Sequence, residues 1–400
     1  MRRCILYIVC CLLALTAMAT GGGKSNPVRI ALLTCSPGEE VYELFGHTAI
    51  RCTNSSQEYD VVFNYGVFDF DTSYFFLRFA LGQTDYQLAV VPYENFEWEY
   101  ARRGSQVTEQ VLNLTPAESE RLERQLWRNF QPLDRIYRYN FFYDNCTMRA
   151  RDRIESALGG VAYYPPGLEG TTFRSWVRQY TKNHPWTDFG INLCLGSEAD
   201  RPLTGRQQMF LPDNLMQAFS HGTVKGGAEL PVRKLVSRER VIIPLSKSTS
   251  EVGDGDMLFT PLTVSLLLLV VVAAVSRIEW KQRSVFWGID ILLLLVQGLA
   301  GCIIAFLFFL SEHPTVDTNW LLAILNPLPL VFLPMTVSRI RAGRKNPYDV
   351  FNIVVLILFI AFMPLIPQKI SLAIIPLALV LLIRSVLHLL IARDLDRRQR

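Results

Sequence analysis

Charge is scarce in this 400-residue chain. Only 19% of its residues are charged, and the formal net charge at pH 7 is +4. The sequence has no basic patch interleaved with aromatic residues, which argues against nucleic acid as a partner. Hydrophobic residues make up 50% of the chain, and the excess lies in its second half. This distribution is typical of a protein that is integral to a membrane.

The N-terminal apolar run lacks one feature of a lipoprotein signal, because Cys10 follows Val9 rather than a small residue. The run covers Cys4 to Leu15, comes after two arginines and ends before Ala17-Met18-Ala19. That pattern is typical of a secretory signal peptide with an A-x-A cleavage site. We therefore expect residues 1–19 to be a signal peptide, with an uncleaved N-terminal anchor as the alternative.

A short run of Ser, Thr, Gly and acidic residues over 246–257 predicts a linker. Five apolar stretches follow it, each close to the length that spans a bilayer. They are residues 258–275, 285–310, 319–337, 350–366 and 370–391. We therefore expect a five-helix transmembrane domain over 258–391, followed by a basic cytoplasmic tail over 392–400.

Basic residues are nearly absent from two of the loops between these stretches. Residues 311–318 have none, and residues 367–369 have only Lys369. The other loops and the tail contain Arg277, Lys281, Arg283, Arg339, Arg341, Arg344, Lys345, Arg393, Arg397, Arg398 and Arg400. By the positive-inside rule these basic segments are cytoplasmic. Residues 27–245 are then expected on the outer face of the membrane, as a signal peptide also requires.

Three polar features interrupt the apolar stretches. The run Asn326-Pro327-Leu328-Pro329 breaks the third one, and a broken helix is tolerated in lipid only where protein or water satisfies the freed backbone groups. Arg384 and His388 lie one turn apart near the cytoplasmic end of the fifth. We expect these two side chains to snorkel to the membrane interface.

The region over 27–245 is mixed in composition and predicts one α+β domain. Its clearest helix begins at Thr115-Pro116-Ala117-Glu118, a capping box with proline in the first turn. This helix places Leu122, Leu126 and Phe130 on one face. The region is long enough to bury a hydrophobic core of its own.

Cys146 is the candidate nucleophile of this domain. Helix-forming residues follow it over 147–158 and end at Gly159-Gly160. Asp144 or Asn145 is the expected N-cap. Cys146 then lies in the first turn, where free backbone N–H groups and the helix dipole favour a thiolate. The same N–H groups are placed to hold an oxyanion.

His47 is the candidate base. It begins a strand-like segment that a polar turn over 54–58 separates from a second strand-like segment. If the two pair as a hairpin, His47 lies opposite Asn64 or Tyr65 to within a residue of register. We predict that Asn64 orients the imidazole, with Asp60 as the alternative.

Three other cysteines, Cys35, Cys52 and Cys194, are interpreted as core residues or as members of a disulfide, and the sequence leaves both open.

His313 lies in an outer loop, on the same side of the membrane as Cys146. We predict a substrate contact for His313, with an ordinary loop histidine as the alternative. A thiol and an imidazole need no metal ion and no organic cofactor, so we expect neither.

Five short motifs occur in order between residues 32 and 219. They are Ser36-Pro37-Gly38, Phe45-Gly46-His47-Thr48, Phe63-Asn64-Tyr65-Gly66-Val67-Phe68, Tyr139-Asn140-Phe141-Phe142-Tyr143-Asp144-Asn145-Cys146-Thr147 and Phe210-Leu211-Pro212. Together they resemble the Lnb N-terminal periplasmic domain. With its membrane half, the whole chain is similar to the Lnb-type lipoprotein N-acyltransferases of Bacteroides and its relatives. Histidine before cysteine is also the order in circularly permuted papain-like proteins, which include relatives of lecithin:retinol acyltransferase.

The resemblance implies an α+β permuted papain-like thiol domain followed by an all-α transmembrane bundle. It implies a multi-pass enzyme of the bacterial inner membrane with its catalytic domain in the periplasm. Such an enzyme would move an acyl chain from a membrane phospholipid to the α-amino group of a diacylated lipoprotein. Cys146 would carry the acyl chain as a thioester, and His47 would be the base.

Two other classes of protein explain part of the sequence. A papain-like cell-wall peptidase or amidase would use the same cysteine and histidine, but it gives no reason for five spans. A non-enzymatic membrane scaffold would need the spans and would make Cys146 structural.

Overall fold

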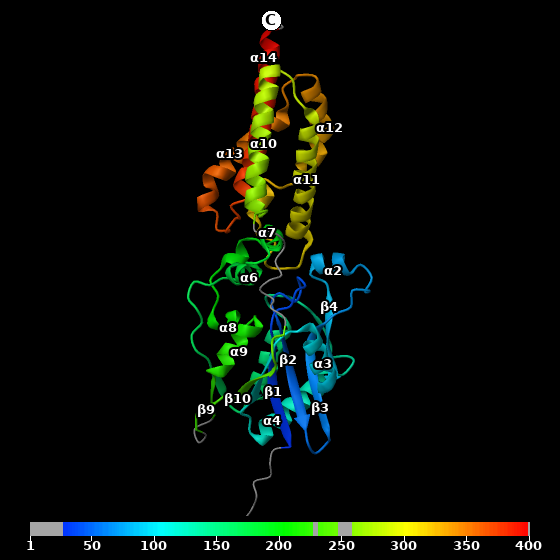
Figure 1. The fold of residues 1–400 in the computed structure, drawn as a ribbon, viewed down its shortest axis with the longest axis vertical. Coiled ribbons are helices and arrows are strands. Elements are labelled where there is room, and N and C mark those ends of the chain that lie inside the picture. Colours follow the sequence, from blue (N-terminus) through cyan, green and yellow to red (C-terminus); the bar gives the residue numbers. More distant parts are fainter. Residues whose placement is uncertain (1–26, 227–230, 247–257, 399–400) are drawn as a thin grey trace, which may run out of the picture.

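The computed structural model describes residues 27–226, 231–246 and 258–398. The predicted signal peptide over 1–19 lies outside the described residues, as does nearly all of the predicted linker over 246–257. Figure 1 shows a mixed α/β domain at one end of the long axis and a helical bundle at the other. This arrangement confirms the predicted fold class of an α+β domain followed by transmembrane helices.

A seven-stranded antiparallel sheet forms the centre of the N-terminal domain, in the order β10-β5-β1-β2-β3-β4-β6. Its strands are β1 (Val28–Cys35), β2 (His47–Asn54), β3 (Tyr59–Val67), β4 (Asp85–Pro92), β5 (Val107–Leu112), β6 (Ile136–Arg138) and β10 (Val236–Ile243). Side chains alternate between the two faces of a strand. In β1, Ile30 and Leu32 therefore enter one hydrophobic core, and Leu33 and Cys35 enter another.

Helices cover both faces of this sheet. The helices α4 (Pro116–Asn129), α5 (Cys146–Ala157) and α9 (Pro212–Ser220) pack on the first face, and α3 (Tyr93–Arg103) packs on the second. The capping box predicted for α4 is confirmed, because Thr115 Oγ1 accepts from the Glu118 amide at 3.3 Å and the Glu118 carboxylate accepts from the Thr115 amide at 2.8 Å.

Shorter elements complete the N-terminal domain. A second sheet has the order β7-β8-β9. The remaining elements are α2 (Phe75–Leu81), β7 (Val161–Tyr163), α6 (Phe173–Thr181), α7 (Pro185–Cys194), η1 (Ser197–Asp200), α8 (Gly205–Gln208), β8 (Thr223–Lys225) and β9 (Arg233–Lys234).

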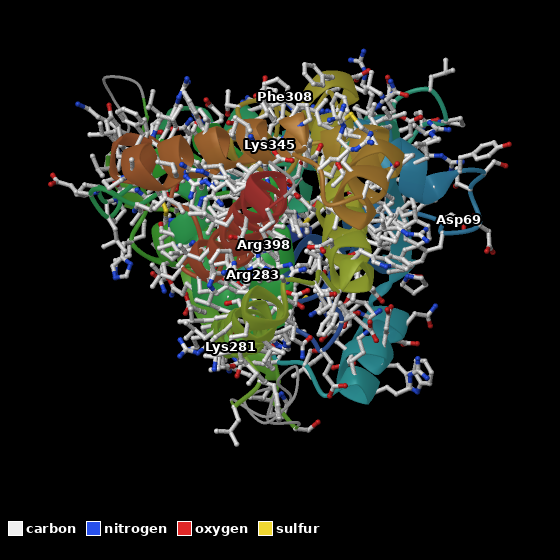
Figure 2. All side chains as sticks on the ribbon, turned by 90° about the horizontal axis from the view of Figure 1, so that it is seen from above. Asp69, Lys281, Arg283, Phe308, Lys345 and Arg398 are labelled. Carbon is white, nitrogen blue, oxygen red and sulfur yellow. The ribbon has the colours of Figure 1, made fainter. Side chains whose placement is uncertain are left out.

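Five segments of the C-terminal half are long and apolar enough to cross a membrane, which confirms the predicted number. They contain α10 (Pro261–Gln282), α11 (Trp287–Leu310), η2 (Trp320–Ala323) with α12 (Leu328–Arg341), α13 (Pro347–Phe362) with η3 (Met363–Leu365), and α14 (Ile374–Arg398). Figure 2 looks onto the end of the bundle that is far from the N-terminal domain, where Lys281, Arg283, Lys345 and Arg398 are labelled. The basic end and the N-terminal domain therefore lie at opposite ends of the spans, as the positive-inside rule predicts.

The third span is broken, as its Asn-Pro-Leu-Pro sequence predicts, and protein groups satisfy the freed backbone. Gln297 of α11 donates from Nε2 to the Ile324 carbonyl at 2.8 Å. Asn326 Oδ1 accepts from the Leu328 amide at 3.1 Å. Gly301 of α11 leaves room for the broken segment, because a Cβ at this position would lie 2.3 Å from the backbone of Asn326.

The prediction that Arg384 and His388 snorkel to the interface is wrong. Arg384 is only 3% exposed, and its guanidinium binds Glu279 of α10 and Asp290 of α11. His388 lies 3.1 Å from Asp290 and 3.3 Å from Asp349 of α13. The partners come from three other helices, so both charged side chains are paired inside the bundle and do not reach the membrane interface.

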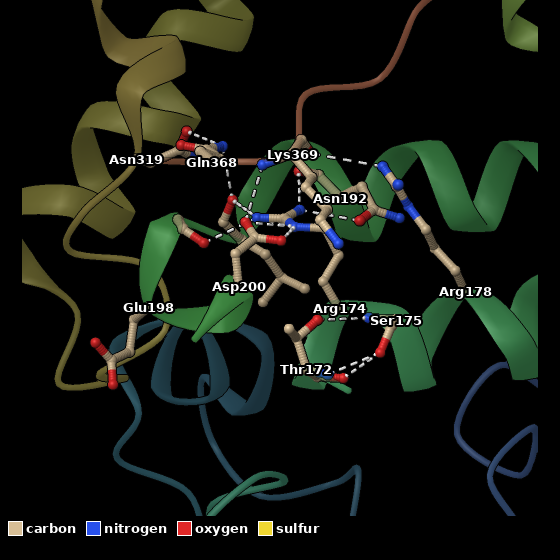
Figure 3. Close-up of polar contacts among 12 residues, drawn as sticks. Thr172, Arg174, Ser175, Arg178, Asn192, Glu198, Asp200, Asn319, Gln368 and Lys369 are labelled. Carbon is tan, nitrogen blue, oxygen red and sulfur yellow. Dashed lines mark hydrogen bonds and ion pairs between the residues drawn. The ribbon is translucent and has the colours of Figure 1, made fainter. Parts of the chain in front are cut away.

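A buried arginine organises the junction between the two domains (Figure 3). Arg174 is fully buried in α6. Its Nε donates to Asp200 at 2.9 Å, its Nη1 donates to Asn192 Oδ1 at 2.9 Å, and its Nη2 donates to the carbonyls of Leu195 and Gly196 at 2.9 and 2.8 Å. Since every N–H of the guanidinium has an acceptor, the ends of α7 and η1 are fixed relative to α6.

The outer loops of the membrane domain bind to the same cluster. The Lys369 amide donates to Asp200 at 3.0 Å, and Gln368 Nε2 donates to the Leu195 carbonyl at 3.0 Å. Asn319 Nδ2 donates to the Leu193 carbonyl at 2.7 Å. The N-terminal domain is therefore docked on the loops that end the spans, and these contacts fix its orientation relative to the helical bundle.

Candidate active site

Cys146 is the first residue of α5, and the residue before it secures its position. Asn145 is the N-cap, since its Oδ1 accepts from the Met148 amide at 3.0 Å. Its Nδ2 donates to the carbonyls of Phe141 and Phe210, both at 2.8 Å. All the polar atoms of this buried amide are engaged, and the partly exposed thiol beside it is held at the start of the helix.

His47 is the first residue of β2, where it pairs with Cys35 at the end of β1. The pairing of Ile50 with Phe63, continued along the two strands, puts His47 opposite Gly66, one residue beyond the expected Tyr65. The side chain of Asn64 still reaches the imidazole, with Oδ1 at 3.3 Å from His47 Nε2. This contact engages Nε2 and leaves Nδ1 as the other ring nitrogen.

Two acidic candidates lie elsewhere in contacts of their own. Asp60, the alternative to Asn64, accepts from the guanidinium of Arg51 at 2.8 Å. Asp144, the alternative N-cap, forms an ion pair with Arg149 at 2.6 Å. Neither carboxylate contacts His47 among the described residues, so Asn64 is the side chain that the structure brings to the imidazole.

The electrostatics of the pair favour a thiolate. Burial alone raises the pKa of Cys146, but the charge of His47 and a hydrogen bond from it outweigh that effect, with help from the Thr48 amide and the Thr147 hydroxyl. The net result is a pKa of Cys146 below the ordinary thiol value. Burial lowers the pKa of His47, but the Cys146 thiolate and Asn64 outweigh it, so the net shift is upward. The two shifts together stabilise a thiolate–imidazolium pair.

A hydrogen bond between two threonine hydroxyls joins β2, which carries His47, to α5, which carries Cys146. Thr48 Oγ1 lies 3.0 Å from Thr147 Oγ1, and both side chains are fully buried. Each threonine follows one of the paired residues, so this contact sets the distance between β2 and the start of α5. Sequence reasoning did not find it, because the two threonines are 99 positions apart.

A glycine and a tyrosine complete the surroundings of the thiol. Gly66 has φ +85°, and a Cβ at that position would lie 3.5 Å from the Cβ of Cys146. Tyr137 Oη lies 3.9 Å from the position that a Cβ on Gly66 would take. Among the described residues this hydroxyl has no hydrogen-bond acceptor. Burial raises the pKa of Tyr137, so its hydroxyl keeps its proton. Tyr137 is a donor that sequence reasoning missed, because its three-residue strand gives no local signal.

The other predicted thiols are free, so the disulfide alternative is wrong. Cys35 and Cys52 are fully buried in the core. Burial raises the pKa of Cys52 to about 12, and it also raises the pKa of Cys35 and Cys194. Among the described cysteines whose pKa is shifted, only Cys146 has a lowered pKa.

His313 contacts the N-terminal domain. Its Nε2 lies 2.9 Å from the Phe79 carbonyl, and its Nδ1 lies 3.4 Å from Asn140 Nδ2. Asn140 pairs with Asp144, two residues before Cys146. His313 therefore supports the turn that precedes the thiol. Within the described residues, no group of His, Cys, Asp and Glu side chains is arranged to hold a metal ion.

These features define an integral membrane protein whose outer α/β domain carries a cysteine–histidine pair. Two family models match the chain: the Lnb N-terminal periplasmic domain over residues 18–179 and the Lnb transmembrane domain over residues 253–395. The chain therefore belongs to the Lnb family, and the resemblance seen in the sequence is confirmed. Neither a curated protein nor a solved structure matches it. It is a multi-pass membrane protein with a periplasmic domain.

Proposed function

We propose that this protein is a lipoprotein N-acyltransferase of the bacterial inner membrane. The observation that carries the proposal is the Cys146–His47–Asn64 arrangement, a lowered-pKa thiol facing an oriented imidazole, on a domain docked against five spans. Cysteine, histidine and asparagine in these roles form the site of papain-like thiol enzymes. The family models identify the domains and leave the reaction to be tested.

The first half of the reaction transfers an acyl chain to the enzyme. The Cys146 thiolate attacks the ester carbonyl of a membrane phospholipid. The backbone N–H groups at the start of α5 and the Tyr137 hydroxyl hold the oxyanion that forms. When the intermediate collapses, His47 gives its proton to the departing glycerol oxygen, and a lysophospholipid leaves. The acyl chain remains on Cys146 as a thioester.

The second half passes the acyl chain to the acceptor. The α-amino group of a diacylated lipoprotein cysteine attacks the thioester carbonyl, and His47 accepts the proton that the nitrogen loses. Cys146 leaves as a thiolate, which restores the starting ion pair. Both substrates are anchored in lipid, which explains why the thiol domain is fixed to the outer end of a membrane bundle. A cell-wall peptide is not anchored in the bilayer, so a substrate of that kind would not require this docking.

The test is acyl transfer by the purified full-length protein in vesicles that contain a phospholipid with an isotope-labelled acyl chain and a synthetic diacylated lipopeptide. We expect the wild type to form labelled triacylated peptide and one equivalent of lysophospholipid. Cys146→Ser should abolish both products, and Tyr137→Phe should slow the reaction by roughly 100-fold, as loss of an oxyanion donor does. Cys302→Ser, which changes an exposed thiol in α11, is the control. Triacylated peptide from Cys146→Ser would refute the proposal.

A further inference from the structure

A ridge of exposed apolar side chains lies on the N-terminal domain over residues 70–79. Its members are all exposed, by about half of the side chain or more than that, which is unusual for large apolar residues clustered on one short segment. They are Phe70, Tyr74, Phe76, Leu77 and Phe79, with exposed fractions between 46% and 79%. We call this surface the aromatic ridge.

The aromatic ridge lies at the level where α11 leaves the membrane. The Glu312 amide, two residues beyond the end of α11, donates to the Leu81 carbonyl of α2 at 2.9 Å. Gln83 donates to the Glu312 carboxylate at 2.7 Å, and His313 contacts the Phe79 carbonyl at 2.9 Å. Figure 1 shows α2 beside the outer end of α11. Aromatic side chains concentrate at this depth in membrane proteins, because one part of the ring is apolar and the other tolerates water.

The aromatic ridge projects sideways past the helices. In Figure 2, Asp69, the residue just before the ridge, lies clear of the outline of the bundle. The last residues of α11, Phe309 and Leu310, are themselves 69% and 59% exposed and continue the apolar surface into the span. The bilayer beside the bundle is therefore what faces the ridge.

The inner side of the aromatic ridge packs on residues that are close in sequence to the Cys146 site. Phe75 stacks on Phe68 with 5.5 Å between ring centroids, and Phe68 is two residues beyond Gly66, the glycine that lies against Cys146. Tyr42 packs on Phe68 at 6.0 Å and lies five residues before His47. The strand end and the loop that position the two reacting groups thus also form the inner wall of the ridge.

The charges near the aromatic ridge exclude an electrostatic mode of lipid binding. Asp69 and Asp71 are exposed beside it. The nearest arginine on α2, Arg78, is engaged by Asp85 at 2.8 Å. An acidic border would repel anionic headgroups, so binding must come from apolar contact with acyl chains.

We propose that the aromatic ridge inserts into the outer leaflet and holds the acyl chains of a phospholipid at the entrance to the Cys146 site. The assignment of those chains to the acyl donor rests on the proposed function. Insertion into the leaflet does not, and the test separates the two.

The first measurement is photo-crosslinking of the full-length protein in neutral phosphatidylcholine vesicles, with a benzophenone amino acid in place of Phe76. The control places it at Tyr163 of β7, a 54% exposed aromatic residue in the small sheet at the end of the domain far from the membrane. We expect a phospholipid adduct at position 76 and not at 163, with a yield that is the same at low and high salt. Equal yields at the two positions would overturn the proposal.

The second measurement is the KM for phospholipid in the acyl-transfer assay. Phe76→Ser should raise it about tenfold, because an aromatic ring no longer enters the leaflet. Alkylation of Cys146 by a small water-soluble reagent should stay unchanged, and Tyr163→Ser should change neither quantity. An unchanged KM in Phe76→Ser would overturn the capture of the donor. A wild type without acyl transfer would refute the proposed function, while the adducts would still decide the insertion.

Discussion

Replacement of Arg174 by methionine tests how the N-terminal domain is fixed to the membrane. The side chain is fully buried and donates to Asp200, Asn192 and two carbonyl groups. Arg174→Met leaves the Asp200 carboxylate, which is 4% exposed, without its partner. Loss of one member of a buried pair costs about 3–5 kcal/mol. For a domain of this size the cost lowers the Tm by roughly 10 °C.

The assay is thermal unfolding of the detergent-solubilised full-length protein, followed by circular dichroism. Arg201→Met is the control, because Arg201 is 72% exposed and its ion pair with Glu198 contributes little. The double variant Arg174→Met, Asp200→Leu removes both charges, so it should recover part of the lost stability. A Tm for Arg174→Met equal to that of Arg201→Met would show that the buried contacts of Arg174 do not stabilise the protein.

Three further predictions concern the thiol site and the membrane bundle. His47→Ala removes the charge that lowers the Cys146 pKa, so alkylation of Cys146 at pH 7 should slow by on the order of 100-fold. Asn64→Ala removes a hydrogen bond that raises the His47 pKa, so the alkaline limb of the pH–rate profile for acyl transfer should move to lower pH. Arg384→Met removes the arginine partner of two buried acids, Glu279 and Asp290, and leaves Asp290 with His388 alone among the described residues, so it should lower the Tm by several degrees. Arg393→Met, on the exposed side of α14, should not lower it.

The outcomes that contradict these predictions are distinct. His221→Ala removes an exposed imidazole and should leave alkylation unchanged, so equal rates for the two histidine variants would exclude His47 as the partner of the thiol. A pH–rate profile that does not move in Asn64→Ala would exclude its effect on the imidazole. Equal Tm values for the two arginine variants of α14 would show that the buried ion pairs do not stabilise the bundle.

The features that could be predicted from the sequence are those with a local cause. The capping box at Thr115, the hairpin after His47, the helix that begins at Cys146 and the five apolar spans each depend on residues that are near one another in the sequence. Turn chemistry, capping and hydrophobic length act at that range. These elements predicted an α+β domain followed by five spans, and the family resemblance added the papain-like class of the thiol domain.

The features that could not be predicted depend on contacts between distant segments. Arg384 has local signals that are typical of a snorkelling residue, but its acidic partners lie on α10 and α11. The contacts of Arg174 come from helix ends that no periodicity identifies. Tyr137 lies beside Gly66, next to Cys146, on a three-residue strand at the edge of the sheet. Only the tertiary structure brings such groups together.

The most direct test of acyl transfer to lipoproteins by Cys146 is mass spectrometry of lipoprotein N-terminal peptides from cells that lack this protein. The cells are complemented with the wild type, with Cys146→Ser or with Cys302→Ser. We expect triacylated N-termini with the wild type and with Cys302→Ser, and diacylated N-termini with Cys146→Ser. Triacylated N-termini in the uncomplemented cells, or in cells with Cys146→Ser, would contradict this expectation.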